Sequence, residues 1–173
     1  MASIGMAFAG LTSGYVVAKG SLEAKNIWQT IALPSAFYIS TAAIILSSIL
    51  LIRGQQAFSK GSPQTALRLL QVAAVLGVVF LGFQLAGWQH LVDANIWFTG
   101  PKSTPAGSWL YVITWFHWMH VVAGVMVLGV TTWKARQGRY TVDSHLGYDL
   151  AAQFWHFLGI LWIYLLLFLA FLS

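Results

Sequence analysis

Apolar residues along this chain occur in long uncharged stretches that are separated by short bands of charge. The uncharged stretches are residues 2–18, 26–52, 69–92, 103–133 and 150–173. A helix needs about 17 to 25 apolar residues to cross a hydrocarbon core of ~30 Å, and each stretch is about that long. The pattern predicts an all-α integral membrane bundle of five transmembrane helices. We expect the spans at about 2–18, 28–52, 64–91, 107–133 and 147–172.

Composition supports a membrane location. The chain is 58% hydrophobic and 8% charged, whereas about a quarter of the residues in a soluble domain are charged. The connections between the spans are too short to fold by themselves, so we expect one membrane domain over residues 1–173. The first stretch lacks the basic n-region of a secretory signal. We therefore expect it to be a transmembrane span of the mature protein and not a cleaved signal. Cysteine is absent, and this excludes disulfides, thiolate metal sites and iron–sulfur clusters.

The net charge of +5 fits membrane topology better than nucleic acid, and no nucleic acid partner is expected. Most basic residues fall in the second and fourth connections, namely Arg53, Lys60, Arg68, Lys134, Arg136 and Arg139. The positive-inside rule places these connections in the cytoplasm, the N-terminus inside and the C-terminus outside. The third connection carries only Asp93 and Lys102 as charges. Because it is rich in turn formers such as Gly100 and Pro101, we expect a small ordered cap on the outer side.

Histidines at membrane depth are the candidate functional residues, because a polar group in hydrocarbon costs several kcal/mol without a partner. His117 and His120 are three residues apart on the fourth predicted helix, and His156 follows Trp155 on the fifth. At ~1.5 Å of rise per residue, all three lie deep enough to meet near the midplane. The candidate lipid-binding or helix-packing cluster is His117, His120, His156, Trp155, Trp88 and, at the interface, His90.

Three interpretations of these histidines remain open from the residues alone. Two facing helices can ligate a haem, here through His120 and His156, as in a membrane cytochrome b. A metal site is disfavoured because none of the uncharged stretches contains Asp, Glu or Cys to complete its ligands. We favour the third interpretation, in which neutral histidines form hydrogen bonds with one another, with backbone or with lipid. The missing carboxylates also disfavour a small transporter. No catalytic, metal-ligating or cofactor-ligating residue is assigned.

Four segments together resemble subunit III of haem–copper (cytochrome c) oxidases. Residues 111–124 resemble its Thr-x-Phe-His-x-x-His-Val-x-x-Gly segment, and residues 155–164 resemble its Trp-His-Phe-Val-Asp-Val-Val-Trp signature. Residues 6–15 resemble Met-x-Phe-x-Gly-Leu-x-x-x-Tyr, and residues 81–84 followed by Trp88 match the end of its third helix in the five-helix form. The resemblance covers nearly the whole chain. The count of five helices is similar to that of bacterial members of the family, which lack two N-terminal helices of the mitochondrial form.

The resemblance implies an accessory, non-redox subunit III of a bacterial haem–copper terminal oxidase. Such a subunit stabilises the catalytic subunit I, holds phospholipid, and supports proton uptake in aerobic electron transport. The expected partners are subunits I and II, phospholipid and a larger respiratory supercomplex. Haem and copper would lie in the partner subunits, with no cofactor in this chain, in the bacterial inner (cytoplasmic) membrane. Three acidic positions of the family are occupied here by Ile4, Gly87 and Gly159, which favours scaffolding over proton collection.

Overall fold

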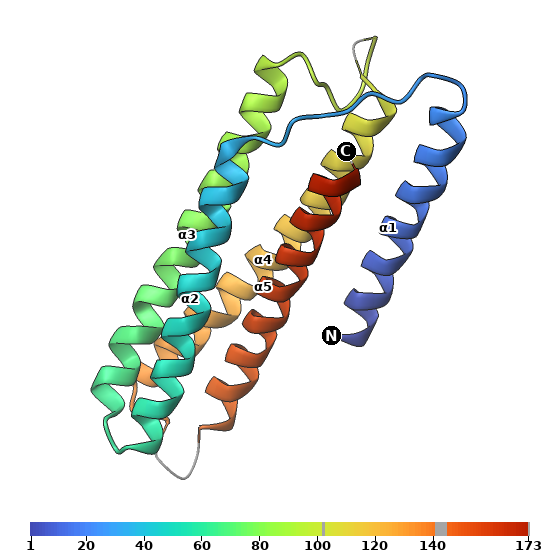
Figure 1. Ribbon diagram of the computed structural model, residues 1–173. Helices are drawn as coiled ribbons and strands as arrows, with labels where there is room; N and C mark the ends of the chain where they lie inside the picture. The colour runs from blue at the N-terminus through green and yellow to red at the C-terminus, as the bar shows by residue number, and fades with distance from the viewer. Residues whose placement is uncertain (102, 141–144, 173) are drawn as a thin grey trace.

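The computed structural model describes residues 1–101, 103–140 and 145–172, and its helices run the length of an elongated bundle (Figure 1). The helices are α1 (Ala2–Glu23), α2 (Ser35–Ser59), α3 (Pro63–Asp93), α4 (Pro105–Arg136) and α5 (Leu146–Leu172). The all-helical prediction is therefore confirmed. Lys102 of the third connection and the C-terminal residue Ser173, which the topology prediction places outside, are not among the described residues.

Four helices, α2 to α5, are long and apolar enough to cross a membrane. Within the described residues, α1 does not meet the same criterion, although it has 22 residues. Its composition gives the reason, because Gly, Ser and Thr recur along it and Lys19 lies near its end. The prediction of five spans is thus supported for four helices. A membrane-crossing α1 and the orientation of the termini stay predictions.

Prolines set the starts of three helices. Pro34, with ψ of 141°, ends an extended segment, so α2 begins at Ser35 rather than at residue 28 as predicted. The missing N–H of proline and its fixed φ suit this boundary. Pro63 is the first residue of α3, one position before the predicted start at residue 64. Pro105 begins α4, where Thr104 Oγ1 accepts a hydrogen bond from the Gly107 N–H at 3.2 Å.

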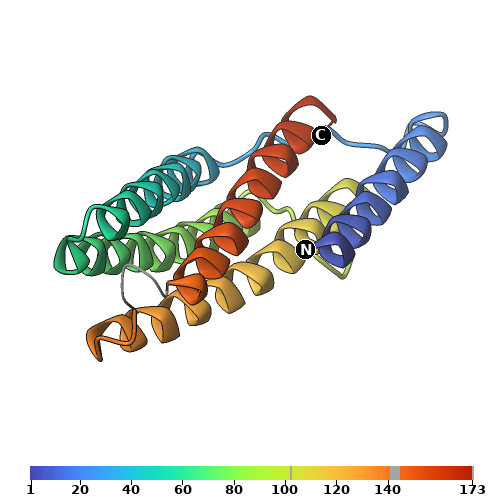
Figure 2. The same ribbon diagram turned by 90° about the horizontal axis from the view of Figure 1, so that it is seen from below.

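Helices α2 to α5 pack in a ring, and α1 lies outside it. Successive helices contact one another, and α2 also contacts α5, which closes the ring. Figure 2 shows α2 and α3 at one edge, α4 and α5 in the middle, and α1 at the opposite edge. Large aromatic side chains fill the core of the ring, among them Phe37, Phe80, Trp155 and Trp162.

The connections lie at two ends of the bundle (Figure 1). The α2–α3 turn and the described part of the α4–α5 connection share one end, and the α1–α2 and α3–α4 connections share the other. The two connections with most of the basic residues therefore lie on one side of the molecule. This placement is what the positive-inside prediction requires.

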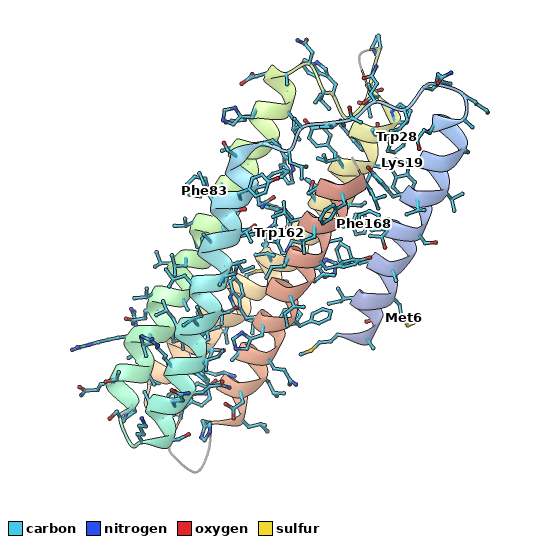
Figure 3. All side chains as sticks on the ribbon, viewed as in Figure 1. Met6, Lys19, Trp28, Phe83, Trp162 and Phe168 are labelled. Atoms are coloured by element: carbon cyan, nitrogen blue, oxygen red, sulfur yellow. The ribbon has the colours of Figure 1, made fainter. Side chains whose placement is uncertain are left out.

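Helix α1 is held by polar contacts to the last turn of α5 and by an aromatic contact to α4. The Tyr15 O–H and the Lys19 ammonium both donate to the Leu172 carbonyl, at 3.0 and 2.7 Å. Lower on the same face, Phe8 packs edge-on against His117 and His120. Figure 3 shows Lys19 and Phe168 in the region where α1 faces the end of α5.

Candidate functional site

His117 is the most deeply buried of the candidate histidines, with 0% of its surface exposed. Its ring stacks on Trp162 with centroids 5.1 Å apart, and Phe8 and Phe80 meet it edge-on, both at 6.1 Å. Neither ring nitrogen has a hydrogen-bond partner among the described residues. The imidazole therefore fills an aromatic core position and leaves two polar atoms unsatisfied.

His120 and His156 face different neighbours. His120 packs against Phe8 of α1, with centroids 5.7 Å apart, and its Nδ1–H donates to the Phe116 carbonyl of its own helix at 2.6 Å. His156 lines a groove of about 300 Å³ between α2 and α5, beside Ser48 and Gly159. Its buried Nε2 has no partner among the described residues. No hydrogen bond between the three histidines is found within the described part of the chain.

This geometry does not favour the haem alternative. A bis-histidine iron needs two imidazoles that face one another. His120 instead contacts α1, and His156 lies in the α2–α5 groove. Across residues 1–101, 103–140 and 145–172, no group of three or more His, Cys, Asp and Glu side chains is arranged to hold a metal ion.

The other members of the predicted cluster have separate positions. Trp155 is fully buried and lies over two glycines, one on α3 and one on α4. A Cβ at Gly77 would come within 2.6 Å of the Trp155 ring, and a Cβ at Gly124 within 3.1 Å. Trp88 donates its indole N–H to Thr114 Oγ1 at 3.1 Å. His90 is exposed near the end of α3. Trp155 therefore packs helices together, and Trp88 joins α3 to α4.

Polar side chains inside the bundle join neighbouring helices. Gln84 donates to Ser40 Oγ at 2.9 Å, and Ser47 donates to the Ala73 carbonyl at 2.9 Å, so both pairs join α2 to α3. These bonds give polar groups inside the bundle a partner and tie the two helices to each other. They follow the usual role of hydroxyl and amide side chains in membrane bundles.

Sequence reasoning missed two aromatic residues that join α5 to α2. Trp162 donates to Thr41 Oγ1 at 2.9 Å, and Tyr148 donates to the Leu51 carbonyl at 3.1 Å. Both rings are almost fully buried. The available signal was that buried Trp and Tyr normally find a partner for the N–H or O–H. Identifying that partner requires the three-dimensional packing.

Ile4, Gly87 and Gly159 stand at the three positions where the resemblance implies acidic residues. A Cβ at Gly87 would overlap the Phe37 ring, so that position has no room for a carboxylate. Gly159 is open by comparison, since a Cβ there would meet Ser48 Oγ at 3.4 Å. Ile4 packs against the hydrophobic core. An apolar contact or a groove thus lies at each of these three positions.

The long apolar helices and the buried polar ties define the class: the chain is a helical integral membrane protein. A model of the family described as cytochrome c oxidase subunit III matches residues 26–173. The chain belongs to the cytochrome c oxidase subunit III family, and the resemblance found in its motifs is confirmed.

Individual relatives agree with this assignment. Cytochrome c oxidase subunit 3 of Synechocystis sp. is 28% identical over 91% of this chain and 66% of its own length. The same subunit of Thermostichus vulcanus is 28% identical over 91% of this chain and 76% of its own length. A probable cytochrome c oxidase subunit 3 of Rickettsia prowazekii is 30% identical over 76% of this chain and 46% of its own length. The chain thus spans about half to three quarters of these relatives.

Proposed function

We propose that this chain is the accessory, non-redox subunit III of a bacterial haem–copper terminal oxidase. It stabilises the catalytic subunit I, holds phospholipid, and so sustains proton uptake and aerobic electron transport in the inner membrane. Its partners are subunits I and II, bound phospholipid and a larger respiratory supercomplex. Haem and copper lie in the partner subunits. Membership of the cytochrome c oxidase subunit III family is the observation that carries this proposal.

The interior of the bundle supports a scaffolding role. Its buried polar residues, among those described, are Thr12, Ser40, Ser47, Gln84, Thr114, His117 and Thr131. None of them carries a permanent charge, and most bond to backbone or to another of these helices. A proton relay through a membrane normally uses Asp, Glu or His chains. Some of these side chains instead join one helix to another, as Gln84 does with Ser40 and Ser47 with the Ala73 carbonyl.

The outer surface supports a role in binding lipid or protein within the membrane. Large apolar side chains are exposed along the spans, including Val75, Val78, Met126 and Ile160. A large exposed apolar surface of this kind suits hydrocarbon or a partner helix rather than water. With Ile4, Gly87 and Gly159 at the acidic positions, support for proton uptake would act through the stability of subunit I.

Purification of the complex through a tag on this chain tests the proposal. Mild detergent extracts should contain subunits I and II, with haem and copper, and should reduce dioxygen. The chain expressed alone should give no stoichiometric Soret band. A Soret band that survives purification of the chain alone, and disappears in His156→Ala, would instead establish the cytochrome b alternative.

A further inference from the structure

A pocket with aromatic walls lies where the end of α3 meets the start of α4. Its volume is about 400 Å³, and it is lined by Trp88, Phe98, Tyr111, Val112 and Trp115. All but one of these lining residues are aromatic. The volume is within the usual range of small-ligand sites, about 300 to 1,000 Å³.

The aromatic walls are held in place by hydrogen bonds within the chain. Trp88 is oriented by its bond to Thr114 Oγ1. Tyr111 donates its O–H to the Ile96 carbonyl at 3.0 Å, and its ring meets Phe98 edge-on at 6.0 Å. The Phe98 carbonyl in turn accepts a bond from Ser108 Oγ at 2.8 Å. The connection after α3 is therefore fixed over the pocket, as the sequence prediction of an ordered cap requires.

These bonds determine which ligand chemistry suits the pocket. Trp88 and Tyr111 use their donors inside the chain, which leaves the indole N–H of Trp115 as the donor available among the lining residues. A quinone needs donors at both of its carbonyls, and a primary ammonium needs up to three acceptors. A trimethylammonium group needs neither, because the π faces of aromatic rings attract it directly.

Charge near the pocket also favours a cation. Asp93 lines an adjoining pocket that shares Trp88 with the aromatic pocket. A carboxylate beside an aromatic wall adds to the attraction of the rings for a positive charge. Among the described residues, no lysine or arginine lines either of these two pockets.

The pocket lies at the depth of a lipid headgroup. Helix α3 has 31 residues and is therefore about 46 Å long, which exceeds a hydrocarbon core of ~30 Å by about 8 Å at each end. Trp88 precedes the last residue of α3 by five positions, or about 7.5 Å. In a centred helix, the Trp88 ring is thus at the boundary between hydrocarbon and headgroups.

We propose that this aromatic pocket binds the trimethylammonium headgroup of a phosphatidylcholine molecule in the adjacent leaflet. The inference rests on the lipid-holding part of the proposed function and gives it a site and a headgroup. Trp115 is the residue to vary, because 48% of its surface is exposed and its ring contacts no other aromatic ring among the described residues. Its replacement should therefore change the pocket and leave the fold intact.

The test compares lipid retention by the full chain in nanodiscs of phosphatidylglycerol that contain small, equal fractions of phosphatidylcholine and phosphatidylethanolamine, with and without an added quinone. After transfer to detergent, native mass spectrometry counts the lipids that stay bound. The wild-type chain should retain phosphatidylcholine in preference to phosphatidylglycerol and phosphatidylethanolamine. Trp115→Leu should reduce that retention about fivefold, and Trp115→Phe should keep most of it.

Trp133→Leu is the matched control, since Trp133 is a 57% exposed tryptophan at the other end of α4. It should retain phosphatidylcholine like the wild type. Equal retention of all three lipids, unchanged retention in Trp115→Leu, or displacement of phosphatidylcholine by a quinone would each overturn the inference. A separate measurement, co-purification of subunit I with the tagged chain, tests the proposed function independently of the lipid pocket. A chain that selects phosphatidylcholine but never associates with an oxidase would support the pocket and contradict the proposed function.

Discussion

Gly77 of α3 lies directly under the Trp155 ring, whereas Gly82, five residues further along the same helix, faces open space. Gly77→Ala should destabilise the chain by about 1–3 kcal/mol, because its Cβ would press on Trp155 and Val125. Gly82→Ala is the control and should be neutral or slightly stabilising, since alanine favours helix. Thermal unfolding in detergent measures both. Equal midpoints for the two variants would contradict this packing role.

His117 permits a second residue-scale prediction. Its imidazole has two buried nitrogens without partners among the described residues, and a polar group in that state costs free energy. His117→Leu should therefore leave the free energy of unfolding unchanged or raise it by about 1 kcal/mol. Trp162→Leu is the contrast and should be strongly destabilising, because it removes a large ring from the core. A large loss of stability in His117→Leu would indicate a bound partner, such as a water molecule.

Some residue roles could be predicted from the sequence and others could not. Hydroxyl and amide groups at membrane depth, such as Gln84 and Ser40, need internal partners, so their packing role follows from composition alone. The spacing of Gly77, Gly82 and Gly87 gives no such information. Their different roles depend on which ring a neighbouring helix places opposite each one. The sequence shows that the three histidines lie at similar depths in the membrane. It does not show which way each helix is turned, so it could not predict whether their side chains meet.

At the scale of elements, α1 is the helix with the fewest ties to the rest, and Lys19 is one of them. Its ammonium donates to the last carbonyl of α5, where the negative end of the helix dipole favours a cation. Lys19→Met should weaken the docking of α1 and increase hydrogen exchange in residues 2–23 several-fold. Lys25→Met provides the control, because Lys25 is exposed just beyond α1. Protection of α1 that is identical in both variants would exclude this anchor.

Helix number and type were predictable from the sequence, whereas boundaries and order in space were less so. Long apolar stretches bounded by charge predict spans because hydrocarbon requires them. The start of α2 was placed at residue 28 because residues 28–33 are uncharged, yet Pro34 keeps this segment extended. That α2 pairs with both α3 and α5, and α1 with α4, depends on side-chain fit between helices. The positions of charged residues along the sequence carry no information about which helices pair.

At the scale of the whole molecule, the two basic connections lie at one end of the bundle. The positive-inside rule then predicts that the connections around Lys60 and Arg136 are cytoplasmic and that the chain ends outside. Cysteines introduced at Ser59 and at Gly100, one at each end, should react with a membrane-impermeant reagent from opposite sides. Labelling of position 59 from the outside of intact cells would show that the orientation is reversed.

An accessory role also makes a prediction for the assembled oxidase. His156 lines the open α2–α5 groove and, among the described residues, forms no hydrogen bond or ring contact with another helix, so His156→Leu should change the surface of the bundle more than its interior. Because the haems and copper belong to partner subunits in the proposed function, the variant oxidase should keep its haem spectrum and most of its initial turnover. If the groove holds lipid as proposed, His156→Leu removes a polar partner for that lipid, so the complex should lose the lipid or this subunit sooner in detergent, at a cost of ~1 kcal/mol. His90→Leu, at an exposed site on α3, serves as the control and should behave like the wild type. If oxygen reduction stops at once in a His156→Leu complex that retains this subunit, its lipids and all haems, the imidazole carries protons directly and the scaffolding proposal is wrong.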